Sequence, residues 1–282
     1  MIVSRSKASV DAVALHYDEL DHWYQVIWGE HVHHGLFESR RETIPEATEK
    51  LIELLARELD PKPGDLLCDV GCGYGGTARY LAENFGAHVT GVTVSTAQAE
   101  YAQEHSAQGV DIRVCDFLKS DFDDEYFDIV MSIESTEHFD DKSQLFAELF
   151  RILKPGGRIG VFAWLSKHNP APWEVRWLLE PICREGHLPG IGDQDEYQQL
   201  LQDAGFASLD FTDLSNSVKR TWTLVIRRIA NQLLVNQEAR SFIRSGFSNT
   251  AFLKTLFRIR LAYALGSMRY GLFTAVKPKD SW

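Results

Sequence analysis

A glycine-rich loop directly after a short apolar run is the feature that most limits the folds open to this chain. The apolar residues 66–70 end at the sequence Gly71-Cys72-Gly73-Tyr74-Gly75-Gly76. Glycines at the carboxyl end of a buried strand let the backbone turn sharply and let a cofactor approach it closely. Taken alone the pattern also suits a dinucleotide. The loop therefore predicts a cofactor at one edge of a sheet without identifying it.

Strands and helices alternate regularly after this loop. We expect helices near 75–85, 95–107, 142–153 and 194–204, and strands near 87–92, 110–114, 127–133, 157–164, 207–212 and 271–276. Strands that alternate with helices of ten or more residues imply crossover connections and a parallel sheet covered on both faces. The predicted fold class is α/β, with a doubly wound, mostly parallel seven-stranded sheet.

The chain divides into four predicted parts. Residues 1–60 form an N-terminal lid and a first helix, which the capping pair Thr43 and Glu46 starts and Pro61 follows. The lid is expected to be helical, although its aromatic and imidazole residues give no clean helical or strand pattern. Residues 61–165 form the cofactor-binding core. Residues 166–268 form an acceptor-binding insertion and helical cap that includes the core elements at 193–213, and 269–282 form the last strand and tail.

Charge and cysteine content exclude several classes of protein. The net charge of the 282 residues is −11, so we expect no general binding of nucleic acid. Residues 214–269 run against this trend, with ten Lys or Arg and one Glu. Four scattered cysteines predict no disulfide framework and favour a reducing, cytoplasmic compartment. We find no signal peptide and no transmembrane segment.

Polar and aromatic residues at the ends of later strands narrow the identity of the cofactor. Asp116-Phe117 follows the third strand and Glu134 closes the fourth. The stretch 91–95 lacks the acid that a dinucleotide enzyme uses for its ribose. With Lys154-Pro155-Gly156-Gly157 before the fifth strand, the chain resembles the class I S-adenosylmethionine-dependent methyltransferases, over residues 60–165 and the last strand. This resemblance implies a Rossmann-like fold and S-adenosyl-L-methionine as cofactor.

The resemblance also implies which residues bind the cofactor. The end of the first strand and the glycine loop would hold the methionine part, and Asp116 and Phe117 would hold adenine. Thr93 stands where the class usually has the ribose-binding acid, which leaves Ser95 or Gln98 as the substitute. The predicted cofactor-binding residues are Asp69, Gly71, Cys72, Gly73, Gly75, Thr93, Ser95, Gln98, Asp116, Phe117 and Glu134.

Within the class, the chain is similar to a group that contains tocopherol C-methyltransferases, sterol C-methyltransferases and cyclopropane fatty acid synthases. Residues 28–35, 134–138 and 269–274 look like motifs of the tocopherol enzymes. Residues 91–95 with Gln98 are similar to the cyclopropane synthases, in which Glu137 would match a bicarbonate ligand. The histidine that the synthase site also needs is absent near Trp164.

The group's chemistry suggests candidates for the reacting site. A methylated carbon acceptor must lose a proton, and a histidine or carboxylate near the methyl donor would accept it. The candidates are Glu137, His138, His33 and His34. Aromatic residues that favour a sulfonium or carbocation through cation–π attraction predict the pocket wall: Tyr17, Tyr24, Trp28, Trp164, Trp173 and Trp222. No ligand pattern accompanies the histidines, so we predict no metal.

The sequence therefore predicts C-methylation of a hydrophobic prenylated or isoprenoid acceptor. Two alternatives stay open: N- or O-methylation of a natural product, and a methyltransferase-fold cyclase or binding protein that transfers no methyl group. The basic block at 214–269 has three interpretations, namely a cap that docks on the chain's own acidic face, a site for an anionic acceptor, and peripheral contact with an anionic membrane. Homo-oligomer formation also stays open.

Overall fold

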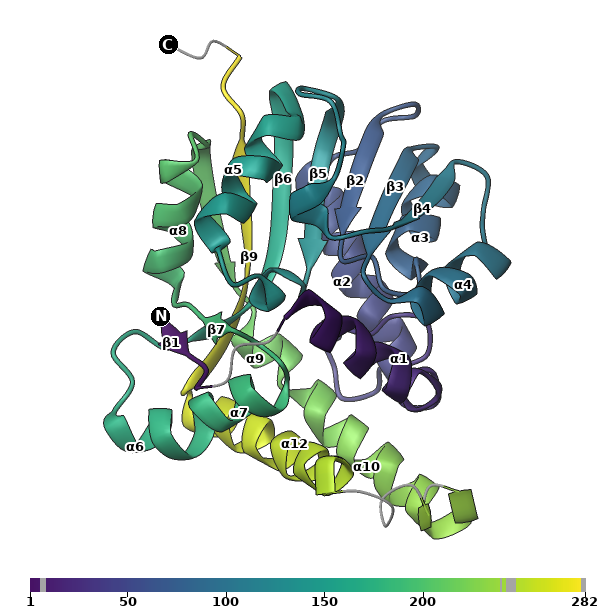
Figure 1. Ribbon diagram of the computed structural model, residues 1–282, viewed down its shortest axis with the longest axis vertical. Helices are drawn as coiled ribbons and strands as arrows, with labels where there is room; N and C mark the ends of the chain where they lie inside the picture. Colours follow the sequence, from purple (N-terminus) through teal and green to yellow (C-terminus); the bar gives the residue numbers. More distant parts are fainter. Residues whose placement is uncertain (6–8, 239, 242–246, 280–282) are drawn as a thin grey trace.

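The computed structural model describes residues 1–5, 9–238, 240–241 and 247–279, without the side chains of 247–253. Seven strands form one sheet in the order β4-β3-β2-β5-β6-β9-β8 (Figure 1). The strands are β2 (Leu66–Val70), β3 (His88–Thr93), β4 (Val110–Val114), β5 (Phe127–Ile133), β6 (Leu153–Ser166), β8 (Ala207–Asp213) and β9 (Met268–Val276). Only β9 runs antiparallel to its neighbours within this sheet. The predicted α/β class with a mostly parallel sheet is confirmed.

Helices cover both faces of the sheet. Successive residues of a strand point to opposite faces, and in β2 Leu67 packs into one core cluster while Cys68 and Val70 pack into another. The first cluster includes α2 (Ile44–Leu59) and α3 (Gly76–Phe85), and the second includes α5 (Lys142–Ile152) and α8 (Gln194–Asp203). The strands are therefore buried on both sides, which explains their continuous apolar sequences.

The helix α2 begins and ends where local sequence signals predict. The Thr43 side chain accepts from the backbone N–H of Glu46, and the Glu46 carboxylate accepts from that of Thr43. At the other end Asp60 adopts a left-handed conformation, with φ of 46°, before Pro61. The capping box is worth about 1 kcal/mol to the helix.

The N-terminal residues form a long helix that the sequence pattern did not delimit. α1 (Val10–Ile27) lies beyond the carboxyl ends of the parallel strands (Figure 1). Only Val13 and Ile27 of this helix are buried, and inward positions such as Tyr17 carry polar atoms, so no clean apolar stripe marks the helix. Before α1, β1 (Ile2–Val3) pairs with β7 (Gly190–Ile191) in a small sheet that the sequence analysis missed.

The remaining helices lie at the same end of the sheet as α1 (Figure 1). They are α6 (Pro172–Glu174), η3 (Val175–Leu179), α7 (Glu180–Glu185), α9 (Ser215–Val218), α10 (Arg220–Val235) and α12 (Phe247–Leu265). Three shorter elements follow strands of the sheet: α4 (Thr96–Glu104) follows β3, η1 (Phe117–Lys119) follows β4, and η2 (Thr136–His138) follows β5. In the described ranges, no helix combines the length and apolarity needed to cross a bilayer. The cytoplasmic location stays a prediction.

Candidate active site

The glycine loop lies where the order of the strands reverses. The chain leaves β2 toward β3 and β4 on one side, and β5 pairs with the other side of β2. Gly71 and Gly73 have positive φ angles of 82° and 54°. A Cβ atom on Gly71 would lie 2.2 Å from the Cβ of Ser135, whereas a Cβ on Gly73 would meet nothing within 4 Å. Gly71 thus permits close packing of the two strand ends, and Gly73 leaves space for a ligand.

A cavity of about 170 Å³ opens beside this loop. It runs from the loop past the ends of β3 and β4 to the end of β5, and α1 covers it. The predicted cofactor residues in its wall are Gly71, Gly73, Thr93, Gln98, Asp116, Phe117 and Glu134. The Thr93 hydroxyl donates to the Gln98 side-chain oxygen at 2.9 Å, so two of the residues predicted near the ribose are linked to each other.

Asp69 provides a test of whether these residues fit S-adenosylmethionine. Its side chain is buried, and its Oδ2 atom has no hydrogen-bond partner among the described residues. Burial raises the pKa of this carboxyl to about 7. With Cys72 and Gly73, Asp69 lines a small cavity beside the loop. A buried carboxylate without a partner is stabilised by a ligand that is cationic or donates hydrogen bonds. The amino group of S-adenosylmethionine is such a group, so Asp69 fits this cofactor.

A second cavity, of about 100 Å³, lies between β5, β6, α1 and the cap helices. Five of the six aromatic residues predicted for the pocket line it: Tyr17, Tyr24, Trp28, Trp164 and Trp222. Ile182 of α7 and Leu256 and Ile259 of α12 add further apolar wall. We refer to the cavity beside the glycine loop as the cofactor-side cavity and to this one as the acceptor-side cavity. Four residues line both of them: Tyr17, Val32, Glu134 and His138. The two cavities therefore meet at these four residues.

Glu134 organises the wall between the cavities. Its carboxylate accepts hydrogen bonds from the backbone N–H and Nδ1 of His34 at 2.7 and 2.9 Å, from Trp164 Nε1 at 2.6 Å and from the Tyr270 hydroxyl at 2.7 Å. Burial alone would raise the pKa of Glu134, but the contacts with His34 and His33 outweigh it and lower this pKa to about 2. Glu134 is thus an ionised, fully hydrogen-bonded group.

The structure corrects the interpretation of His34 as a base. Its Nδ1 contacts Glu134, and its Nε2 accepts from the indole N–H of Trp222 at 2.7 Å. An indole nitrogen only donates, so Nε2 carries the lone pair and Nδ1 the proton. Neither ring nitrogen of His34 is therefore free to take a proton from a methyl acceptor. His33 differs, because its Nδ1 contacts the His34 carbonyl at 2.8 Å and its buried Nε2 has no partner among the described residues.

His138 is the candidate base at the junction of the cavities. Its Nε2 lies 3.0 Å from the Tyr17 hydroxyl, which α1 positions. Burial, with a smaller contribution from nearby cationic groups, lowers the pKa of His138 to about 4, and burial raises the pKa of Tyr17. The imidazole is therefore neutral near pH 7 and able to accept a proton.

Glu137 lies at the floor of the second cavity. Its carboxylate accepts from the backbone N–H of Trp164, and only 1% of the residue is exposed. Burial raises the pKa of Glu137 above its ordinary value and lowers that of the neighbouring Lys142. Glu137 lines the acceptor-side cavity but not the cofactor-side one.

Three predicted site residues lie elsewhere. Trp173 is 51% exposed in α6 and lines neither cavity, so its assignment to the pocket is wrong. Ser95 is buried and donates to Asp18 of α1 at 2.5 Å, which makes it an anchor of the lid rather than a cavity residue. Gly75 is the left-handed residue that starts α3 and also lies outside both linings.

Two further residues contribute to the site and were not predicted from the sequence. Tyr270 in β9 donates to Glu134, and His16 in α1 lines the acceptor-side cavity beside Tyr24. The Tyr270 contact joins residues 136 positions apart, and no local pattern signals it.

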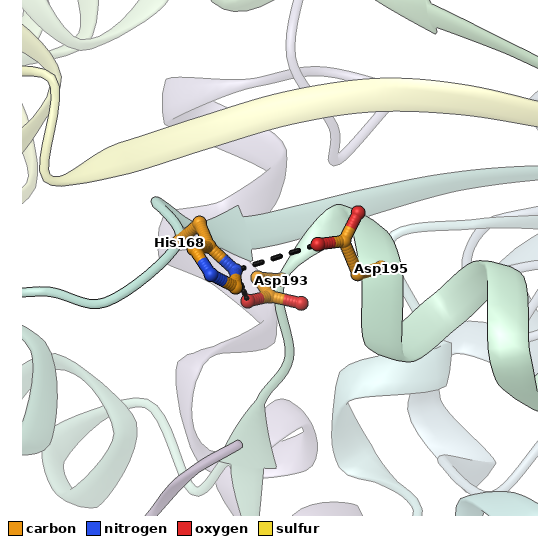
Figure 2. Close-up of side chains that lie close together, drawn as sticks. All are labelled: His168, Asp193 and Asp195. Atoms are coloured by element: carbon orange, nitrogen blue, oxygen red, sulfur yellow. Dashed lines mark hydrogen bonds and ion pairs between the residues drawn. The ribbon is translucent and has the colours of Figure 1, made fainter.

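One cluster of three potential metal ligands occurs in the described ranges: His168, Asp193 and Asp195 (Figure 2). His168 Nδ1 lies 2.9 Å from Asp193 and 3.4 Å from Asp195. Asp193 also accepts from the backbone N–H of Glu196 as the cap of α8. An ion pair at a helix start accounts for this cluster, which lines neither cavity.

The chain is similar to known methyltransferases and cyclopropane synthases. Residues 4–245 match the family described as mycolic acid cyclopropane synthetase. The chain is 33% identical to the chloroplastic tocopherol O-methyltransferase of Arabidopsis thaliana, over 94% of this chain and 82% of that protein. It is 30% identical to the 27-O-demethylrifamycin SV methyltransferase of Amycolatopsis mediterranei, over 97% and 99%.

A solved structure shares the fold. The mycolic acid cyclopropane synthase CmaA1, in a complex with SAH and CTAB, has a TM-score of 0.85 and 22% identity, over 97% of this chain and 100% of that one. The seven-stranded order, the glycine loop and the cavity at the strand reversal define an S-adenosylmethionine-dependent methyltransferase. Within that class, the chain belongs to the mycolic acid cyclopropane synthetase family.

Proposed function

We propose that this methyltransferase methylates a carbon atom of a hydrophobic acceptor that carries a prenyl or other isoprenoid chain. One observation carries the proposal: the cofactor-side cavity meets an aromatic-walled cavity at Tyr17, Glu134 and His138. An acceptor in the second cavity would face the first across these residues. S-adenosylmethionine supplies the electrophilic methyl group when bound.

The chain's own contribution is orientation, exclusion of water and removal of one proton. Direct attack on a methyl group requires the acceptor atom, the methyl carbon and the sulfur in line, and fixing that geometry lowers the barrier by several kcal/mol. The buried network around Glu134 holds Trp164 and His34 in the wall of the acceptor cavity. The helix α1 covers the junction and contributes Tyr17.

The weak basicity of the junction favours a carbon acceptor. Carbon methylation of an alkene or aromatic ring leaves a cation, which is a strong acid and gives its proton to a weak base. His138, with its pKa lowered to about 4, is such a base. A phenol or an ammonium group has an ordinary pKa of about 10 and would need a much stronger base.

The wall of the acceptor cavity supports the same chemistry. Faces of Trp and Tyr rings attract cations through their quadrupoles, by about 0.5–2 kcal/mol each. Trp28, Trp164 and Trp222 all line the cavity. Its volume of about 100 Å³ is less than the roughly 150 Å³ of an engineered cavity that binds benzene. An isoprenoid acceptor would therefore require the cap helices to separate and its chain to leave between them.

A transfer assay tests the proposed acceptor class. The purified protein is incubated with S-adenosylmethionine carrying an isotopically labelled methyl group and with a prenylated phenol, a prenyl diphosphate or a sterol. We expect label in at least one product, located on carbon by NMR. Label on oxygen or nitrogen only, or no label in any product, contradicts C-methylation of an isoprenoid.

Replacement of the base separates chemistry from binding. His138→Asn should reduce kcat about 100-fold or more and leave the affinity for S-adenosylhomocysteine within about twofold, because general-base catalysis contributes 10²–10⁴-fold. His88→Asn, at an exposed position of β3, is the matched control and should be unchanged. A kcat of His138→Asn close to that of wild type excludes His138 as the base.

A further inference from the structure

A groove beside the cap helices gathers positive charge. It measures about 700 Å³, and its wall contains the five cationic residues Arg40, Lys219, Arg220, Arg227 and Arg260, together with Thr223, Tyr263 and Ala264. None of these residues lines either cavity of the active site. We refer to it as the basic groove. It lies on a different side of the same two helices, α10 and α12, that wall the acceptor cavity.

Helical spacing builds this groove. Arg220, Thr223 and Arg227 recur at intervals of three and four residues and therefore share one side of α10. Arg260 and Tyr263 share one side of α12 in the same way. The two helices lie side by side (Figure 1), so their two stripes face one groove.

The positive charges of the groove are not neutralised by ion pairs among the described residues. Within the part of the chain that the structure describes, none of the five cationic residues forms an ion pair with a carboxylate. Arg220 donates to the backbone carbonyls of Ser39 and Arg40 at 2.9 and 2.5 Å, and Lys219 donates to the Asn216 side chain at 2.8 Å. By contrast Arg258, also in α12, pairs with Glu185.

This arrangement is unfavourable without an anion. Like charges that share a groove repel one another. The chain has a net charge of −11 and therefore many carboxylates, but none of those described forms an ion pair with these five cationic residues. The Arg220 side chain is already fixed by two carbonyls and lies over the Phe37 ring at 5.0 Å. Planar guanidinium groups match phosphate oxygens two at a time, and a lysine adds a point charge.

We propose that the basic groove binds a phosphate-bearing anion. The same chemistry is present in a free phosphorylated or diphosphorylated molecule and in the headgroup of an anionic lipid. The site is separate from the methyl-transfer reaction, and its test measures binding alone. If the proposed acceptor class is wrong, the inference about the groove still stands. If the groove binds no phosphate-bearing anion, the proposed acceptor class still stands.

Calorimetric titration with inorganic pyrophosphate at low ionic strength tests the free anion. Co-sedimentation with phosphatidylcholine vesicles, with and without phosphatidylglycerol, tests the headgroup. The double variant Arg227→Glu, Arg260→Glu reverses two exposed charges of the groove. The matched control is Arg57→Glu with Lys62→Glu, which reverses two exposed charges outside the groove and changes the net charge by the same amount. A second variant, Arg227→Gln with Arg260→Gln, removes charge without reversing it, and circular dichroism checks that each variant folds.

We expect at least one of the two probes to bind both wild type and the control. The same probe should bind the double variants at least tenfold more weakly, and its affinity for wild type should fall as the salt concentration rises. Pyrophosphate binding with no response to phosphatidylglycerol identifies a free phosphorylated ligand. Sedimentation that requires phosphatidylglycerol identifies a lipid headgroup. If wild type binds neither probe, or if the folded variants bind as wild type does, the proposal is wrong.

Discussion

At the scale of single residues, two glycines of one loop have different functions. A Cβ on Gly71 collides with Ser135, whereas a Cβ on Gly73 projects into open space beside the cofactor cavity. Gly73→Val should therefore weaken S-adenosylhomocysteine binding at least 100-fold with little change in unfolding temperature. Gly71→Val should lower the unfolding temperature as well. Calorimetry and thermal melts of both variants provide the check, and unchanged affinity in Gly73→Val would show that the ligand does not approach this glycine.

We expect Asp69 to make cofactor affinity depend on pH. Its carboxyl has a pKa raised to about 7 by burial, and only the ionised form attracts a cationic amino group. Affinity should therefore rise as pH increases, by about tenfold between pH 6 and pH 7.5. The pKa values of His16, His31 and His138 are lowered to about 3 to 4, so these histidines do not titrate in this range. Calorimetric titrations of wild type and Asp69→Asn across this pH range test the prediction. The variant should bind the cofactor weakly, and its affinity should not change with pH.

The candidate site residues that the sequence alone can point to are those with local signals. Asp69 and Gly73 follow directly from a strand that ends in a glycine loop. The hydrogen bonds of Glu134 depend instead on His34, Trp164 and Tyr270, which separate segments bring to the end of β5. Sequence alone therefore offers His34 as a base, although the fold uses both of its ring nitrogens elsewhere.

At the scale of elements, two polar contacts join α1 to the core. Asp18 accepts from the Ser95 hydroxyl at 2.5 Å, and Asp21 accepts from the Tyr74 hydroxyl at 2.6 Å. Since these bonds to charged groups are partly exposed, we assign them about 2 kcal/mol together. Asp18→Ala with Asp21→Ala should increase opening of the lid about thirtyfold, measured as faster limited proteolysis within α1 and weaker cofactor binding.

Asp11→Ala is the control for the lid variant, because Asp11 lies exposed in the first turn of the same helix. It should be cleaved at the wild-type rate. Equal cleavage of the double variant and this control would mean that apolar packing, through Val13 and Ile27, is sufficient to hold α1.

Local sequence signals also explain which elements were predictable. The capping box of Thr43 and Glu46 and the turn after Asp60 define α2 without reference to the rest of the fold. The helix α1 has a local cap in Ser9, but its inward residues include Tyr17 and Tyr24, which line the acceptor-side cavity and do not form an apolar stripe. The pairing of β1 with β7 requires residues 2 and 191 to meet, which only the assembled molecule specifies.

At the scale of the whole molecule, the strand reversal, the lid and the cap place two cavities and the basic groove around one end of the sheet. The cofactor-side cavity lies at the carboxyl ends of β2 and β5, and residues of α1 line it. The helices α10 and α12 present Trp222 and Ile259 to the acceptor cavity and Arg227 and Arg260 to the basic groove. One pair of helices thus lies between an apolar cavity and a charged surface.

This arrangement predicts how two ligands stabilise the protein together. S-adenosylhomocysteine at 100 times its dissociation constant should add about 2.7 kcal/mol to the free energy of unfolding. For a chain of this length that is about 5 °C in unfolding temperature. Because the cofactor cavity and the basic groove share no residue, a shift caused by pyrophosphate should add to it.

Thermal melts with each ligand and with both check this sum. In Arg227→Glu, Arg260→Glu the shift from S-adenosylhomocysteine should persist while that from pyrophosphate disappears. Gly73→Val should show the opposite pattern, since it obstructs only the cofactor cavity. A combined shift well above the sum in wild type would contradict independence and would mean that α10 and α12 transmit anion binding to the cofactor site.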